Sequence, residues 1–113
     1  MDLYHKDVYM PSDFDKYDFL ASIDHLKLSD HFVNRVWHKK LPIPTLEALA
    51  NGEVFEIGKE GNVVVKVCFR LRVYRNHKDL VYVISNFGHL ITGWWQRRND
   101  KHYTLDISKY SVI

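Results

Sequence analysis

Cysteine is almost absent from this sequence of 113 residues, where Cys68 is the only one. A single cysteine argues against a disulfide framework and against a structural zinc site, which needs about four ligands. The sequence also lacks an apolar run near the ~20 residues of a membrane-spanning helix. Its first residues carry charges where a signal peptide has an apolar segment. We therefore expect a cytoplasmic protein with no membrane partner.

Several catalytic signatures are missing as well. There is no glycine-rich phosphate loop, no G-x-S-x-G nucleophile turn and no pair of histidines at zinc-ligand spacing combined with a carboxylate. Enzyme chemistry, where there is any, is therefore expected to be independent of metals and cofactors.

The composition is that of a globular domain, at 46% hydrophobic and 14% aromatic residues. We expect one domain over residues 1–113, with an acidic helical lead (1–28), further helices (29–52) and a sheet (53–113). Residues 1–30 have seven Asp and three Lys, whereas residues 31–113 have seven acids and thirteen Lys and Arg. The net positive charge of residues 31–113 suits an anionic ligand such as nucleic acid. The alternative is that these charges only keep the protein soluble.

Residues 13–50 have apolar positions at the three- and four-residue spacing of helices. Ser12 or Asp13 can cap a first helix, and Ser29 or Asp30 a second. The apolar stripe of the second helix contains Phe32, Val33, Val36 and Trp37. The LPIP segment at 41–44 ends that helix. Thr45 can cap a short third helix that stops near Gly52.

From residue 53 onward the pattern is that of strands separated by short turns. The strand segments are EVFEI (53–57), VVVKVCFRLRVY (63–74), LVYVIS (80–85), LITGWWQR (90–97) and HYTLDI (102–107). Short turns between consecutive strands predict an antiparallel meander. We therefore expect an α+β fold, with N-terminal helices packed on one face of a four- to five-stranded antiparallel sheet.

The segment at 63–74 carries its cations on one face. Strand alternation separates Val67, Phe69 and Leu71 from Lys66, Arg70 and Arg72. Because the helices are expected on the apolar face, the cationic face is expected to be open and able to hold phosphates. The alternative is a solvated face with cross-strand ion pairs.

The second predicted helix carries a line of polar groups. His31 and Arg35 are four residues apart and share a face, which Lys39 extends by one turn. Histidine can transfer a proton near neutral pH, and arginine can stabilise the charge of a phosphoryl transition state. The alternative is a surface histidine on an amphipathic helix.

The segment GWWQRRNDKHYTLD contains the remaining candidates. Alternation places Thr92 and Trp94 on one face and Trp95 and Arg97 on the other. One tryptophan therefore faces the helices, while the other can stack on a base beside the arginines. Beyond Arg98, a histidine, a carboxylate and a hydroxyl alternate on one face: Asp100, His102 and Thr104. The alternative is that both tryptophans belong to the core and that RRNDKH is a polar hairpin.

The order of motifs is more specific than any one of them. Along the chain stand H-x-x-x-R-V on a helix, ALANGEV-x-E, a basic strand, DLVYVI and LITGWW…ND-x-H-x-TLD. This order resembles that of small toxin-like domains of the barnase–EndoU–colicin–RelE ribonuclease superfamily, which occur in bacteria and phages. The resemblance covers residues 29–106, and the acidic first thirty residues are not part of it.

The resemblance implies helices against a four-stranded antiparallel sheet, and RNA cleavage in which the 2′-hydroxyl attacks the adjacent phosphate without a metal. It implies a bacterial cell or a phage-infected host as the location. His31 and Arg35 match the helix pair, and Arg70 or Arg72 matches the strand cation. Thr92, Asp100, His102 and Thr104 match the later motifs.

The leading hypothesis is thus a small metal-independent endoribonuclease or toxin-like RNA-binding domain. His102 or His31 would be the base and acid, and Trp94 or Trp95 would stack a base. Further expected groups of the site are Arg35, Arg70, Arg72, Thr104, Lys66, Arg97, Arg98, Thr92 and Asp100. The alternative is a non-catalytic phage or bacterial regulator that binds a host protein or nucleic acid. A protein partner or antitoxin is compatible with both hypotheses, and the oligomeric state stays open.

Overall fold

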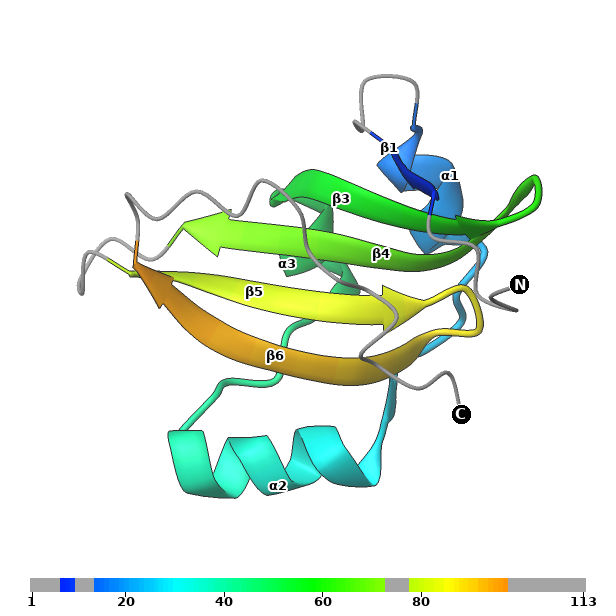
Figure 1. The fold of residues 1–113 in the computed structure, drawn as a ribbon. Helices are drawn as coiled ribbons and strands as arrows, with labels where there is room; N and C mark the ends of the chain where they lie inside the picture. The colour runs from blue at the N-terminus through cyan, green and yellow to red at the C-terminus, as the bar shows by residue number, and fades with distance from the viewer. Residues whose placement is uncertain (1–6, 10–13, 73–77, 98–113) are drawn as a thin grey trace.

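The computed structural model of the protein describes residues 7–9, 14–72 and 78–97 (Figure 1). These residues form three helices and one six-stranded sheet. The strands are β1 (Asp7–Tyr9), β2 (Lys27–Leu28), β3 (Glu53–Glu60), β4 (Val63–Arg72), β5 (Lys78–Ser85) and β6 (His89–Arg97).

Each helix begins at a polar side chain that accepts a hydrogen bond from the first turn. α1 (Lys16–Ala21) is capped by Asp15, α2 (Asp30–Lys39) by Ser29, and α3 (Leu46–Ala50) by Thr45. The caps of the last two helices confirm the sequence prediction. The first helix starts later than Ser12 or Asp13. α2 ends where Lys40 adopts a left-handed conformation with φ 53°, directly before the LPIP segment.

Strands β3 to β6 form the predicted antiparallel meander, in which each strand pairs with the next. The turns follow from local chemistry. Gly61 between β3 and β4 and Gly88 between β5 and β6 both have positive φ, a conformation that glycine adopts without strain. The sheet order is β1-β3-β4-β5-β6-β2.

The prediction of a four- to five-stranded, wholly antiparallel sheet is therefore wrong in two respects. β1 and β2 come from the N-terminal lead that was expected to be helical, and they form the two edges of the sheet. β2 also runs parallel to β6. Both strands are too short for an alternating pattern, and backbone bonds such as Lys27 N–H to the Gly88 carbonyl (2.9 Å) hold β2 in place. The predicted HYTLDI strand lies outside the described residues.

The larger of two buried hydrophobic clusters lies on the face of the sheet that includes Val67, Phe69 and Tyr82. α1 and α3 lie behind the sheet, whereas α2 runs alongside β6 at its edge (Figure 1). Fully buried core side chains come from both the helical and the strand segments: Phe32, Leu41, Leu49, Val67, Phe69, Tyr82, Ile84 and Leu90. The hydroxyl of Tyr82 donates to the Pro42 carbonyl (2.8 Å), so the segment after α2 is fastened to the centre of the sheet.

Ser29→Ala should lower stability more than an ordinary cap substitution. Ser29 is 5% exposed. Its Oγ accepts from Phe32 N–H (3.0 Å) and donates to the Ile91 carbonyl (2.9 Å). Losing the cap and leaving that buried carbonyl unsatisfied should together cost about 2 kcal/mol. The control Thr45→Ala removes an exposed cap from a five-residue helix and should cost about 0.5–1 kcal/mol. Urea unfolding measures both, and equal losses would contradict this role of Ser29.

Candidate nucleic-acid interface

Helix α2 is fixed along the edge of β6. β2 pairs only with His89 and Leu90 of β6. The backbone N–H and C=O groups further along this edge therefore need other hydrogen-bond partners. Four side-chain hydrogen bonds join α2 and its flanks to β6 in order: Ser29 Oγ to the Ile91 carbonyl (2.9 Å), His31 Nε2 with Thr92 Oγ1 (3.0 Å), Arg35 Nε to the Gly93 carbonyl (2.5 Å) and Trp95 Nε1 to the Lys39 carbonyl (3.3 Å). The helix and the strand therefore run in the same direction and end near each other.

Three of the predicted site residues meet at this contact. His31 is exposed, Thr92 is 2% exposed, and Arg35 lies one turn further along α2. Arg35 uses Nε for the Gly93 carbonyl. The structure assigns no hydrogen bond within the described residues to its two terminal nitrogens. A proton carrier, a hydroxyl and an arginine thus lie together. Helix spacing predicted the shared face of His31 and Arg35, but the sequence analysis did not predict the contact of His31 with Thr92.

The second face of the sheet, away from α1 and α3, is not open. Its strand residues Cys68, Val81 and Val83 have no exposed surface, and Lys66 is 4% exposed. Burial raises the pKa of the Cys68 thiol, and the nearby Glu56 carboxylate raises it further. The prediction of an open cationic face is therefore wrong, and Lys66 is not available to a phosphate there. Strand alternation predicted which face each side chain is on, but not that this face is buried.

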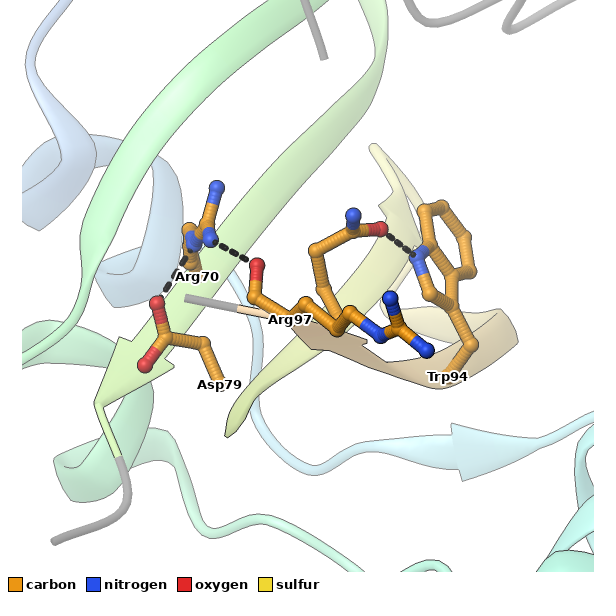
Figure 2. Close-up of polar contacts among 5 residues, drawn as sticks. Arg70, Asp79, Trp94 and Arg97 are labelled. Carbon is orange, nitrogen blue, oxygen red and sulfur yellow. Dashed lines mark hydrogen bonds and ion pairs between the residues drawn. The ribbon is translucent and has the colours of Figure 1, made fainter. Parts of the chain in front are cut away.

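Arg70 is part of a cross-strand ion pair. Its Nε lies 2.7 Å from Asp79 Oδ2, and its Nη2 donates to the Arg97 carbonyl (3.1 Å), as Figure 2 shows. The Asp79 side chain is 6% exposed, so the pair is largely desolvated. The cross-strand ion pair matches the alternative interpretation of the basic strand, although the face is not solvated as that interpretation expected. Because Arg70 is engaged by Asp79, it is not a free phosphate-binding group. Arg72, two residues along β4, is exposed.

The two tryptophans of β6 face opposite sides, as alternation predicted. Trp95 packs against the core on the helix face and donates to the Lys39 carbonyl. Trp94 packs against the cluster on the second face, and its Nε1 donates to Gln96 Oε1 (2.9 Å). Both rings are half-buried. Both therefore have a structural role, which disfavours them as a platform for a base.

His31 and Arg70 are not brought together. In the sheet register, Thr92 lies opposite Val83, which lies opposite Cys68, two residues before Arg70. Two strand spacings and two residues along the strand separate the backbones of Thr92 and Arg70 by roughly 12 Å. The Arg70 guanidinium is directed to Asp79 and the end of β6, away from Thr92. The candidates Arg98, Asp100, His102 and Thr104 lie outside the described residues.

A group of exposed cations lies where several elements end, and we call it the basic end: Lys39, Lys40, Arg72, Lys78 and Arg97. Lys78 is directly opposite Arg97, and Arg72 is opposite the next residue of β5. The tips of β4 and β6 lie on the same side of the molecule as the end of α2 (Figure 1). The sequence analysis identified Arg72 and Arg97 but missed Lys78 and Lys40, because strand ends meet only through the register.

Metal and membrane features are not found in the part of the chain that the structure describes. It has no group of three or more His, Cys, Asp or Glu side chains arranged to hold a metal ion. No helix in it combines the length and apolar composition needed to cross a membrane.

Comparison of the chain with protein-family models, with curated proteins and with solved structures found no match.

Arg70→Met should destabilise the protein, whereas Arg72→Met should have little effect. The first change removes the arginine partner of the Asp79 side chain, which is 6% exposed, at a cost of about 3 kcal/mol. The second removes an exposed cation from the same strand and face and should cost less than about 0.5 kcal/mol. Thermal or urea unfolding measures the difference. Equal stability of the two variants would show that the Arg70–Asp79 pair has no structural role.

Proposed function

We propose that this protein binds RNA through the basic end. One observation carries the proposal: Lys78 and Arg97 are exposed and directly opposite each other on neighbouring strands. Like charges at such positions destabilise a sheet, and a bound phosphate offsets the repulsion. Arg72 lies on the other face of the sheet at the same end, and Lys39 and Lys40 lie at the end of α2 beside β6.

Two acids of the described residues lie near this end. Asp79 is engaged by Arg70. Glu53, at the start of β3, is exposed opposite Arg70 in the register. The five exposed cations outnumber these two acids, and they lie around the ends of three strands and a helix. Such a surface suits the repeated charges of a phosphate backbone better than it suits a single small anion.

Replacing Arg72, Lys78 and Arg97 together with Gln should weaken RNA binding about tenfold or more at moderate salt. The slope of log affinity against log salt should fall by about 0.7 for each phosphate that the variant no longer neutralises. Fluorescence anisotropy with a labelled RNA across a salt series measures both quantities. Two single changes provide a matched comparison. Lys78→Gln removes one cation of the basic end, whereas the control Lys27→Gln removes an exposed cation beside the opposite end of β6. If the two single changes lower RNA affinity equally, the basic end is not the RNA-binding surface.

A second candidate activity, metal-independent RNA cleavage, is favoured by the contact of His31 with Thr92 beside Arg35. In this reaction His31 accepts the proton of a 2′-hydroxyl, whose oxygen bonds to phosphorus while the 5′ oxygen leaves. Water, or a second acid such as His102, supplies the proton to the leaving oxygen. The terminal nitrogens of Arg35 would stabilise the charge on the phosphate oxygens.

Cleavage predicts fragmentation of total RNA by the purified protein in EDTA. His31→Ala should reduce the rate at least 100-fold, since general acid–base catalysis contributes about 10²–10⁴. His38→Ala is the control, because His38 is an exposed histidine on α2 without a contact to Thr92 among the described residues. RNA that stays intact with the unaltered protein would end the cleavage proposal while leaving the binding proposal in place.

The described residues of the acidic lead are part of the fold. Its described residues supply β1, α1 and β2, and β2 lies beside the opposite end of β6. Deleting residues 1–28 would therefore remove both edge strands of the sheet. For this reason substitutions at single exposed residues separate RNA binding from protein binding better than that deletion does.

A further inference from the structure

The most exposed large apolar side chain of the described residues is Trp37 on α2. It is 80% exposed, and Val33, one turn before it, is 38% exposed. The sequence analysis placed both in the apolar stripe of the helix, so that assignment is wrong for these two residues. The reason is the position of α2 at the edge of the sheet. Phe32 is fully buried and Val36 is partly buried, which leaves Val33 and Trp37 on the outer side.

An exposed tryptophan is unusual enough to require an explanation, because most tryptophans are largely buried. The other two have partners: Trp94 with Gln96 and Trp95 with the Lys39 carbonyl. Trp37 has no hydrogen bond and no ring contact within the described part of the chain. Its flat apolar face is therefore available to a partner.

The surroundings of Trp37 indicate what that partner is. Residues 31–46 contain no Asp or Glu, but they contain Arg35, Lys39 and Lys40 together with His31 and His38. Lys40, one turn beyond Trp37, belongs to the basic end, whereas Lys39, two residues beyond it, lies on a different side of the helix. A partner suited to this surface combines negative charge with a flat apolar group at close spacing. An unpaired nucleotide has both, in its phosphate and its base.

We propose that Trp37 stacks on an unpaired base of single-stranded RNA whose phosphates lie along the basic end. This inference rests on the proposed RNA binding and names its substrate class. In a duplex the bases are stacked on one another, so their faces are not available to a side chain. A strand that places a phosphate on Lys40, one turn beyond Trp37, presents a base to the indole. The protein therefore selects single-stranded RNA over duplex RNA.

Trp37→Ala should weaken binding of a short unstructured RNA about 10- to 100-fold, the size expected for the loss of one base–aromatic stack. Trp37→Phe should restore most of the affinity, because a phenyl ring also stacks. The salt dependence of binding should stay unchanged, since the cations that hold the phosphates are all still present. The same RNA annealed to its complement should bind the unaltered protein more weakly than the single strand does. Trp37→Ala should not change the affinity for this duplex.

Phe87→Ala is the matched control. Phe87 is a 66% exposed aromatic residue in the turn between β5 and β6, at the other end of β6 from the basic end. It should leave RNA affinity unchanged. Urea unfolding should show equal stability for the Trp37 and Phe87 variants and the unaltered protein.

The outcomes separate this inference from the proposed function. If Trp37→Ala binds RNA as the unaltered protein does, stacking is wrong while RNA binding stands. If single-stranded and duplex RNA bind equally, the substrate class is wrong. If the unaltered protein binds no RNA but binds an acidic peptide in a manner that requires Trp37, both proposals are wrong and the surface is a protein-binding site.

Discussion

The part of the β6 edge that β2 leaves uncovered is the constraint on which the proposed RNA-binding surface depends. β2 covers only the first two residues of β6, and the backbone groups beyond them need other partners. α2 meets this need with side chains. Arg35 donates to the Gly93 carbonyl, and Ser29 donates to the Ile91 carbonyl. Gly93 is suited to this close packing, since a Cβ there would come within 2.8 Å of Leu41 Cδ2.

Several features of the surface follow from this docking. It places His31 against Thr92 and Arg35 against the next residue of β6, Gly93. It carries Lys39 and Lys40 to the end of β6, where Lys78 and Arg97 face each other. It also turns Val33 and Trp37 outward, because a helix at an edge buries only a narrow stripe. The proton carrier, the cations and the exposed indole thus share one structural cause.

The two faces of the sheet show why composition alone misleads about sites. β4 alternates cations with apolar residues, which is typical of a half-open sheet. Yet Cys68 has no exposed surface, Lys66 is nearly buried, and Arg70 is engaged by Asp79 and the Arg97 carbonyl. The positive charge available to a ligand lies at the ends of the strands, where Arg72 and Lys78 are exposed. In β4, Lys66 and Arg70 are therefore part of the folded interior, and Arg72 at the end of the strand is part of the exposed surface.

Local physics determined much of this protein from the sequence alone. Ser29 and Thr45 mark helix starts because their side chains accept backbone N–H bonds, and strand alternation correctly placed Trp94 and Trp95 on opposite faces. The short turns of β3 to β6 made the meander predictable. Other features could not be predicted from a local pattern and depend on the tertiary structure. They are the two short edge strands held by backbone hydrogen bonds, the burial of Lys66, the pairing of Arg70 with Asp79 and the exposure of Trp37. These depend on which segments meet across the sheet, and a periodic pattern specifies the face of a side chain but not what covers it.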